Sequence, residues 1–339
     1  MKTLLIGAGA IGGTVGTLIK NAGFDIRIMC MNDEIKELIE KNGFTLTGAK
    51  GSFHEEFTCY SSYDQLGDEK FDYVIIATKI FVMPKVAKLV LPYLKEDSLV
   101  VGMQNGICTA ELAEVVGDDR AVGCMLGFGA TRISDCEVNM TSKGEMIIGL
   151  HNGAVPPKMK ELESMLAKVL PTSISTDIRR EQYSKLIINS CINSCAAITG
   201  KTLGVIIDDK RARKLFLAVA REAMHVAKAM NFDVPPYAKV LNYKLLMVAD
   251  NAVWNSIAGS LVWVVSKAYG NVRPSTLQSL DHGEKTEIDI FNGYFVRKGA
   301  EFGVDVPVNA KLVEMIHEIE DGKREMTPDN LNEFKGLAF

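Results

Sequence analysis

Near its N-terminus the chain carries the stretch LLIGAGAIGG, residues 4–13, which joins a short apolar run to a cluster of glycines. The run from Leu4 to Ile6 is typical of a buried strand, and it stops at Gly7. A helical pattern follows from Ala10 to Asn21 and ends before a glycine, after which Asp25 to Met31 is strand-like again. The stretch therefore predicts a strand, a tight turn, a helix and a second strand.

The same alternation of strand and helix recurs along the first half of the chain. Tyr73 to Ala77 is a further buried-strand candidate, Met83 to Leu94 is helical, and Ser98 to Met103 is strand-like. Strands that alternate with helices are joined by right-handed crossovers, which place helices over both faces of a parallel sheet. We expect two more strands to complete this sheet, at Gly123 to Gly129 and Glu145 to Leu150.

The character of the sequence changes after Pro171, where strand-like runs become rare and helical patterns dominate. A length of 339 residues suggests about two domains, which we place at 1–175 and 176–339. The first is predicted to be an α/β domain built on a parallel sheet, and the second is predicted to be all-α. The expected helices of the second domain run from Asp177 toward Gly200, Arg211 to Asn231, Tyr237 to Ala249, Asn255 to Lys267, Glu284 to Phe302 and Val308 to Asp321.

Composition and charge exclude several classes of protein. Apolar residues make up 47% and charged residues 24%, which is ordinary for globular domains, and 38 basic against 42 acidic side chains leave a net charge of −4. A mildly acidic chain does not attract nucleic acid or an anionic membrane. The seven cysteines include no C-x-x-C pair, so we expect reduced thiols, no metal site and a cytoplasmic location. We also expect neither a signal peptide nor a spanning helix, since no apolar run approaches ~20 residues.

The segment from Gly7 to Gly12 fits the pattern G-x-G-x-x-G at the point where a strand turns into a helix. There Gly7 permits the turn, Gly9 lets the backbone approach a pyrophosphate, and Gly12 allows close packing of helix and strand. The helix N-terminus attracts the anion. We therefore predict that a dinucleotide cofactor is held by Gly7, Ala8, Gly9, Ala10, Ile11 and Gly12; the alternative is a glycine-rich turn without a ligand.

The end of the second predicted strand does not decide between NAD and NADP. An acidic residue about 20 positions after the glycine motif favours NAD, and Asp33 stands in that region, but it is as well placed to cap a helix. No arginine stands at that end to hold a 2′-phosphate, because Arg27 lies within the strand and should point to a face of the sheet.

Polar residues also follow the next two predicted strands. Lys79 comes directly after Ile75 to Thr78, and Asn105 comes shortly after Val100 to Met103. Open α/β sheets bind ligands at the carboxyl ends of their strands, so both side chains are candidate ligand contacts. The alternatives are a solvated lysine and an asparagine in an Asn-Gly turn.

The most informative segment is YSKLIINSCINSCAA, residues 183–197, which is apolar nearly all round and predicts a buried helix. Lys185, Asn189 and Asn193 are spaced four residues apart and form one polar stripe on it. Burying an amine and two amides without partners is costly, which favours a stripe that lines a wet cleft and binds a polar ligand. The alternative is that the amides bridge neighbouring loops while the lysine reaches solvent.

Glu287 falls in the helix expected from Glu284 to Phe302, where a solvated glutamate is the simplest interpretation. Pairing with Lys185 would give Glu287 a functional role, because a neighbouring carboxylate keeps an amine charged, whereas desolvation lowers the pKa of the amine. No H-E-x-x-H or G-x-S-x-G motif points to a different chemistry.

Taken together, these motifs resemble the ketopantoate reductase (2-dehydropantoate 2-reductase) family over nearly the whole chain. The motifs are G-A-G-A-I-G-G at 7–13, A-T-K at 77–79, Q-N-G at 104–106, K-L-x-x-N-x-x-x-N at 185–193, and a serine at 275 followed by T-E-I-D at 286–289. The resemblance implies an N-terminal Rossmann-type domain and a helical C-terminal domain. It also implies reduction of 2-dehydropantoate, a small 2-oxoacid, to (R)-pantoate with NADPH, on the route to pantothenate and coenzyme A.

The resemblance further implies a role for each candidate residue. Lys185 matches the family's proton donor to the ketone oxygen, and Glu287 matches the glutamate of its active site. The implied substrate contacts are Asn105, Asn189, Asn193 and Ser275. Beside the glycine motif, the implied cofactor contacts are Lys79, Asn105, Ala130 and Glu287.

Three departures from the family's pattern bear on cofactor and substrate. Met31 stands where the family often has an arginine for the NADP phosphate, Ser279 where an acidic residue is usual, and Glu284 where a basic residue is common. NADP is the expected cofactor, with NAD as the alternative.

Two other functions stay open beside ketopantoate reduction. One is an NAD-linked D-2-hydroxyacid dehydrogenase of the same family that acts on another branched or aromatic 2-oxoacid. The other is a non-catalytic nicotinamide-nucleotide-binding regulator. A homodimer is also left open, because the predicted helix with Trp254 and Trp263 suits an interface as well as a core.

Overall fold

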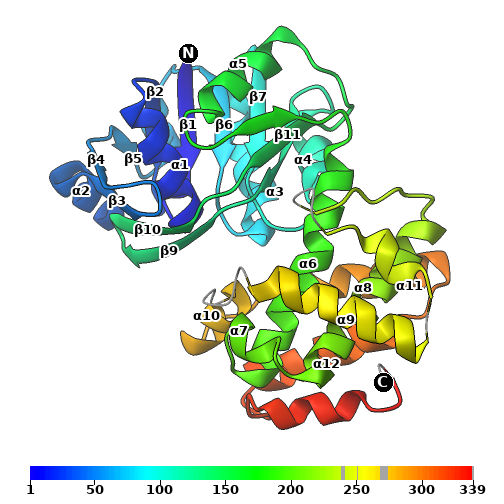
Figure 1. The fold of residues 1–339 in the computed structure, drawn as a ribbon. Helices are drawn as coiled ribbons and strands as arrows, with labels where there is room; N and C mark the ends of the chain where they lie inside the picture. Colours follow the sequence, from blue (N-terminus) through cyan, green and yellow to red (C-terminus); the bar gives the residue numbers. More distant parts are fainter. Residues whose placement is uncertain (238–240, 250, 268–273, 338–339) are drawn as a thin grey trace. The chain divides into compact units, whose positions relative to one another are not determined.

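The computed structural model describes residues 1–237, 241–249, 251–267 and 274–337 (Figure 1). They form two compact units, Met1–Gln182 and Tyr183–Phe339. The helix α6, Ile178–Thr199, carries the chain from the first unit into the second. The domain boundary expected between residues 175 and 176 stays a prediction.

The first unit is built on an eight-stranded sheet with the order β12-β11-β8-β7-β6-β1-β2-β5. The neighbouring strands β8, β7, β6, β1, β2 and β5 run parallel to one another, whereas β11 is antiparallel to β8. The parallel α/β sheet predicted from the alternating pattern is thus confirmed. Its strands are β1 (Lys2–Ile6), β2 (Asp25–Met29), β5 (Cys59–Tyr60), β6 (Phe71–Ile76), β7 (Leu94–Gly102), β8 (Ala121–Leu126), β11 (Met146–Leu150) and β12 (Thr172–Ile174).

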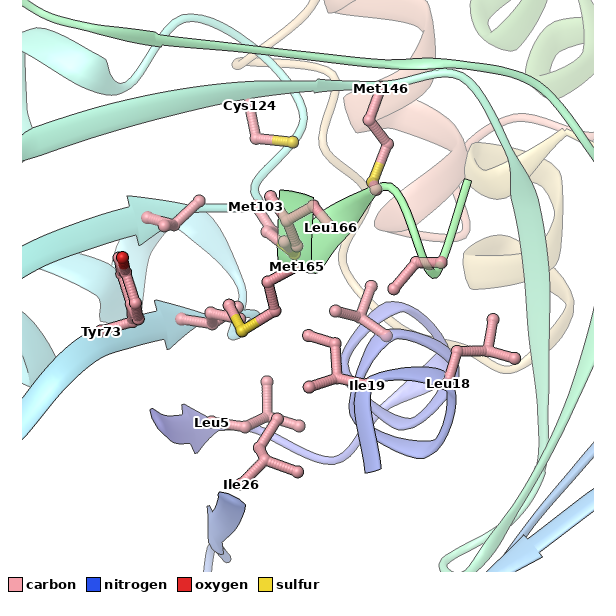
Figure 2. Packing of buried hydrophobic residues seen from close by; sticks show 14 of the residues in the cluster. Leu5, Leu18, Ile19, Ile26, Tyr73, Met103, Cys124, Met146, Met165 and Leu166 are labelled. Atoms are coloured by element: carbon pink, nitrogen blue, oxygen red, sulfur yellow. The ribbon is translucent and has the colours of Figure 1, made fainter. Parts of the chain in front are cut away.

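Helices cover both faces of this sheet because successive strand residues point to opposite sides. In β1, Leu5 belongs to one buried cluster while Leu4 and Ile6 belong to another. Figure 2 shows the first cluster, in which Ile19 of α1 and Met165 of α5 lie over Leu5. The covering helices and the short 3-10 helices of this unit are α1 (Ala10–Asn21), α2 (Asp33–Asn42), α3 (Met83–Val90), α4 (Thr109–Val116), α5 (Pro157–Leu166), η1 (Tyr63–Leu66), η2 (Ile80–Val82) and η3 (Leu91–Tyr93).

A second, four-stranded sheet of the first unit was not predicted. Its order is β4 (Phe53–Glu55), β3 (Phe44–Gly48), β10 (Glu137–Ser142) and β9 (Gly129–Ser134). These strands are short and largely polar, and β3 pairs with β10 across a long sequence separation, so their local signals are weak. The strand predicted over 123–129 is wrong at its end, because β8 stops at Leu126 and β9 begins a strand of this other sheet at Gly129.

In its described part the second unit is helical, which confirms the all-α prediction, and its only strand-like feature is a single bridge between Tyr237 and Leu241. The helix α6 is buried on nearly all sides, and its Tyr183 donates to the carbonyl of Ala223 at 2.7 Å and packs on the ring of Phe295. None of the described helices is long and apolar enough to cross a bilayer. The other helices are α7 (Leu203–Ile206), α8 (Lys210–Ala229), α9 (Ala252–Lys267), α10 (Ser275–Asp281), α11 (Asn292–Phe302), α12 (Pro307–Glu320), η4 (Tyr243–Met247) and η5 (Pro328–Phe334).

Two helices were predicted wrongly. Over 237–249 the described residues form the bridge at Tyr237 and the 3-10 helix η4, while 238–240 lie outside the described residues. The helix predicted from Glu284 starts only at Asn292. The reason is local, because the Thr286 hydroxyl accepts the N–H of Ile288 at 3.2 Å and competes with a helical hydrogen bond.

One carboxylate ties together the amino ends of the central strands. Asp72 at the start of β6 accepts hydrogen bonds from the Lys2 backbone at 2.8 Å and from the ammonium groups of Lys95 at 2.8 Å and Lys158 at 3.2 Å. Burial favours the neutral acid, but these donors outweigh it and hold the pKa of Asp72 well below its usual range.

We predict that Asp72→Asn lowers the free energy of unfolding at pH 7 by ~1–3 kcal/mol, since it removes the charge that two ammonium groups face. A carboxyl group whose pKa is lowered by folding stabilises the protein at pH values above its pKa in the unfolded state, about 3.9. This stabilisation is lost as pH falls through its pKa in the folded state. The difference from the wild-type protein should therefore shrink below about pH 4. Urea unfolding at pH 7 and pH 3 measures both effects. Asp97→Asn, at a carboxylate that is 67% exposed and also contacts Lys158, is the control, and equal stability of the two variants would refute the assignment.

Candidate active site

The glycine-rich turn between β1 and α1 has the geometry of an anion site. Gly7 has a φ of +96°, and its N–H donates to the carbonyl of Met29 at 3.2 Å, which holds the turn against the end of β2. The helix begins at Ala10, directly after Gly9. The N–H groups of the first helical turn are therefore the donors that a pyrophosphate needs.

The space around the three glycines of the motif fits a bound dinucleotide. A Cβ on Gly12 would lie 1.8 Å from the Gly7 carbonyl oxygen, so only glycine lets the helix close onto the turn. A Cβ on Gly9 would meet no atom within 4 Å, so the backbone there borders open space. The residues from Gly7 to Ile11 are half-buried. The turn thus combines a tight inner side with an open outer side, where a pyrophosphate could approach.

Lys79 and Asn105 lie at the carboxyl ends of the adjacent parallel strands β6 and β7, as the sequence predicted. Lys79 is exposed and Asn105 is half-buried. The intervening Gln104 is only 5% exposed, and its amide donates to the carbonyls of Ile76 at 2.8 Å and Thr78 at 3.1 Å. Gln104 belongs to the Q-N-G motif, and it has a role that its sequence position did not predict, because it links the two loops that carry the candidate residues.

Three residues define the surface at the end of β2. Met31 is 82% exposed, the Asn32 side chain accepts the N–H of Ile35 at 2.9 Å and caps α2, and Asp33 accepts a hydrogen bond from the hydroxyl of Ser61. The N-cap of α2 is thus Asn32, one residue before the expected Asp33.

Arg27 lies within β2, as predicted, and its charge is already engaged there. Its guanidinium donates to the Tyr60 hydroxyl at 2.7 Å and pairs with Glu69. Ala130, the last candidate cofactor contact in this unit, is half-buried in β9, where it pairs with Met140.

The helix α6 carries the predicted polar stripe. Lys185 and Asn189 are half-buried, whereas Ile187 and Cys191 are fully buried beside them. The side chain of Asn189 makes no hydrogen bond to any residue described in the second unit. The Asn189 side chain is therefore a polar group of the stripe that can bind a ligand.

Asn193 and Ser275 are brought together, although they lie 82 residues apart in the sequence. The Ser275 hydroxyl donates to the Asn193 side-chain oxygen at 3.3 Å, and the N–H of Thr276 approaches the same oxygen at 3.5 Å. Asn193 is 6% exposed and Ser275 is exposed at the start of α10. This contact makes α10 a neighbour of the stripe, and the part played by Thr276 was not predicted.

Glu287 lies in the turn before α11 and not in a helix, so the predicted location is wrong while the residue stays a candidate. Its carbonyl accepts the N–H groups of Ile290 at 3.0 Å and Phe291 at 3.1 Å. The preceding Thr286 donates its N–H to Glu320 of α12 at 2.7 Å. The backbone of this turn is therefore held in place by α12.

Behind the stripe, a buried polar network connects α6 to three other helices. The Ser190 carbonyl accepts from Asn292 at 3.3 Å, and Asn292 donates to Asn309 at 2.9 Å. Glu222 of α8 in turn accepts the N–H groups of Val308 at 2.8 Å and Asn309 at 2.9 Å. Burial raises the pKa of Glu222, although these hydrogen bonds oppose the shift. The network fixes the helix that presents the stripe.

Two family models match the chain over both of its units. Residues 3–153 match the model described as ketopantoate reductase PanE/ApbA, and residues 177–320 match the model described as its C-terminal part. The chain belongs to the ketopantoate reductase family. Its relatives in this family include the 2-dehydropantoate 2-reductases of Archaeoglobus fulgidus and Pyrococcus abyssi. The first is 25% identical, covering 95% of this chain and 98% of the relative, and the second is 27% identical, covering 96% and 100%.

Solved structures share the fold of this ketopantoate reductase family member over almost its full length. The 2-dehydropantoate 2-reductase of Geobacter metallireducens has a TM-score of 0.81 at 21% identity and covers 94% of this chain and 99% of its own. A D-mandelate dehydrogenase in complex with NADH and anilino(oxo)acetate has a TM-score of 0.80 at 19% identity, with coverages of 95% and 99%.

We predict that Gly9→Ala separates cofactor binding from folding. The new methyl group meets no protein atom within 4 Å, and the backbone at Gly9 is extended, so thermal unfolding should stay within about 2 °C of the wild-type protein. Affinity for NADPH should fall by roughly tenfold or more, because contacts of charged phosphates with backbone N–H groups are blocked. Isothermal titration and differential scanning calorimetry measure the two effects.

The matched control is Gly12→Ala, whose methyl group would overlap the Gly7 carbonyl and should destabilise the first unit itself. Unchanged NADPH affinity in a stably folded Gly9→Ala protein would contradict the assignment of this turn to the pyrophosphate.

Proposed function

We propose that this chain reduces 2-dehydropantoate to (R)-pantoate with NADPH, in the biosynthesis of pantothenate and coenzyme A. The observation that carries the proposal is the stripe of Lys185, Asn189 and Asn193 on a buried helix, with Ser275 hydrogen-bonded to Asn193. A cation, two amides and a hydroxyl are suited to 2-dehydropantoate, a 2-oxoacid that offers a carboxylate, a ketone oxygen and a hydroxyl. Membership of the ketopantoate reductase family supports this substrate class.

The cofactor is assigned to the glycine turn and to four further residues. In this proposal the turn from Gly7 to Gly12 binds the pyrophosphate, while Lys79, Asn105, Ala130 and Glu287 contact other parts of the dinucleotide. A bound reduced nicotinamide supplies the hydride for the carbonyl carbon. The first helical turn of α1 offers its N–H groups for the phosphates, and the open side of Gly9 leaves room for them.

Lys185 is assigned as the acid of the reaction. Its ammonium donates a proton to the ketone oxygen as negative charge develops there, which neutralises the charge in the transition state. Asn189, Asn193 and Ser275 orient the substrate by hydrogen bonds, and Asn105 is assigned as a further substrate contact. Glu287 supplies a carboxylate that favours the charged form of the amine.

A second candidate function is an NAD-linked D-2-hydroxyacid dehydrogenase for a branched or aromatic 2-oxoacid. The end of β2 favours it, because Met31 is exposed there and Asp33 is an acidic group near the position that binds a ribose diol. A non-catalytic nucleotide-binding regulator is disfavoured, since a pure binder has no use for Lys185 and Glu287.

The proposal extends to location and assembly. A cytoplasmic location agrees with seven described cysteines that form no disulfide, six of them buried. A homodimer would use the apolar side of α9, where Val253 is 72% and Ile257 is 51% exposed.

The proposed reaction predicts selective oxidation of NADPH in the presence of 2-dehydropantoate. Steady-state absorbance assays should compare NADPH with NADH, and 2-dehydropantoate with 2-oxoisovalerate and phenylglyoxylate. We expect kcat/KM to be highest for 2-dehydropantoate with NADPH. A preference for NADH with another 2-oxoacid would establish the second candidate instead, and binding of nucleotide without any turnover would establish the regulator.

Lys185→Ala should lower kcat by at least ~10²-fold with little change in NADPH affinity, as expected for loss of a general acid. Lys185→Arg is the matched control, because guanidinium keeps the charge but is a poor proton donor. It should retain substrate affinity better than the alanine variant while kcat stays low. Near-normal turnover in either variant would remove Lys185 from the mechanism.

A further inference from the structure

The turn that carries Glu287 is attached to α12 on both sides of that residue. On one side, Thr286 donates its N–H to Glu320 at 2.7 Å. On the other side, Asp289 faces His317 of α12, with 3.1 Å between its Oδ1 and the imidazole Nε2. The two attachments meet at one place, because the Nδ1 of His317 lies 3.0 Å from the second carboxylate oxygen of Glu320.

The hydrogen-bond inventory of His317 requires a charged ring. Both imidazole nitrogens face carboxylates, and an ionised carboxylate only accepts hydrogen bonds. A neutral imidazole carries one N–H and can serve one of them, whereas the imidazolium serves both. Burial alone would lower the pKa of His317, but Glu320 and Asp289 outweigh it and raise the pKa above its ordinary value.

Other charged groups lie close to this cluster. Lys285 lies 3.6 Å from Glu320 and 3.9 Å from Asp321, and Lys323 lies 2.9 Å from Asp321. Both lysines are at least 70% exposed, so their attraction is screened by water. Burial raises the pKa of Glu320, but Thr286 and His317 outweigh it and lower the pKa, so this carboxylate is ionised. Arg297 also approaches the turn and donates to the carbonyl of Asp289 at 2.8 Å.

We propose that protonated His317 is a clamp that fixes the turn carrying Glu287, so that substrate binding depends on the protonation of His317. The proposal rests on the proposed function, in which Glu287 belongs to the active site. His317 is a positioning residue, because it acts on Glu287 through the backbone of the turn. Asp289, His317 and Glu320 are here called the clamp.

The sign of the pH dependence follows from the raised pKa. The clamp is complete below the pKa of His317 and is lost as pH rises through it. Neutral His317 should keep the contact with Glu320, whose side chain is 3% exposed and needs an internal donor. Asp289 is 62% exposed, so water can replace the imidazole there and the turn is released on that side.

The test compares three variants over pH 6 to pH 9. His317→Lys keeps a charge that does not titrate in this range, His317→Gln removes the charge, and His225→Gln removes an exposed histidine from α8 as the matched control. The measured quantities are KM for the 2-oxoacid, kcat and the affinity for NADPH. A second readout needs no turnover: the amide exchange protection of Ile290 and Phe291, whose N–H groups bond to the Glu287 carbonyl.

In the wild-type protein and in His225→Gln, KM should rise by about threefold or more across the pKa of His317, because the turn that positions Glu287 is released. In His317→Lys it should stay flat and low, and in His317→Gln it should stay flat and high. If KM changed with pH in the same way in the wild-type protein and in His317→Gln, the clamp would be overturned.

The exchange readout distinguishes failure of the clamp from failure of the proposed function. If no 2-oxoacid is reduced, the proposed function fails, while a pH-dependent loss of protection at Ile290 and Phe291 in the wild-type protein and in His225→Gln, but not in the His317 variants, still supports the clamp. Protection that is independent of pH overturns it. Should His317→Gln fail to fold, Asp289→Asn provides the second variant, and it should lower the pKa of His317 measured by NMR titration.

Discussion

The approach of Gly12 to the carbonyl of Gly7 is the contact on which the candidate cofactor site depends. The Gly7 carbonyl oxygen lies so close to Gly12 that a Cβ at position 12 has no room, and this places the start of α1 directly over the end of β1. The N–H groups of the first helical turn then lie at the carboxyl edge of the sheet, where the strand order changes direction on either side of β1. Any larger side chain at position 12 would move the helix and with it these donors.

The hydrogen bonds of Gln104 hold the ends of the next two strands, β6 and β7, in a similar way. A buried amide that donates to two carbonyls of the β6 end holds the loops after β6 and β7 at a fixed distance. The loops that carry Lys79 and Asn105 are therefore held independently of these two side chains. Most buried side-chain amides have satisfied donors, and the Gln104 amide donates to two carbonyls.

In the second unit the constraint is the burial of α6. Packing buries most side chains of this helix, whereas Lys185 and Asn189 are half-buried on one face. The network through Ser190 and Asn292 then prevents the helix from rotating, because a rotation would break buried hydrogen bonds. The turn of Glu287 has weaker support, since one of its two attachments involves a half-exposed histidine and an exposed aspartate. This difference makes that turn the adaptable part of the candidate site.

The sequence by itself determined the parallel sheet, the glycine turn, the all-helical second half and the stripe on α6, because each is encoded in residues close together in the chain. Periodicity places Lys185, Asn189 and Asn193 on one face whatever surrounds them. Only the tertiary structure decided the second sheet, in which β3 joins β10, and the contact between Asn193 and Ser275. It also decided that Glu287 lies in a turn, since the partners that hold this turn, Glu320 and His317, come from α12 about thirty residues further along the chain. Local patterns cannot show such partners, because long-range hydrogen bonds depend on which elements pack together.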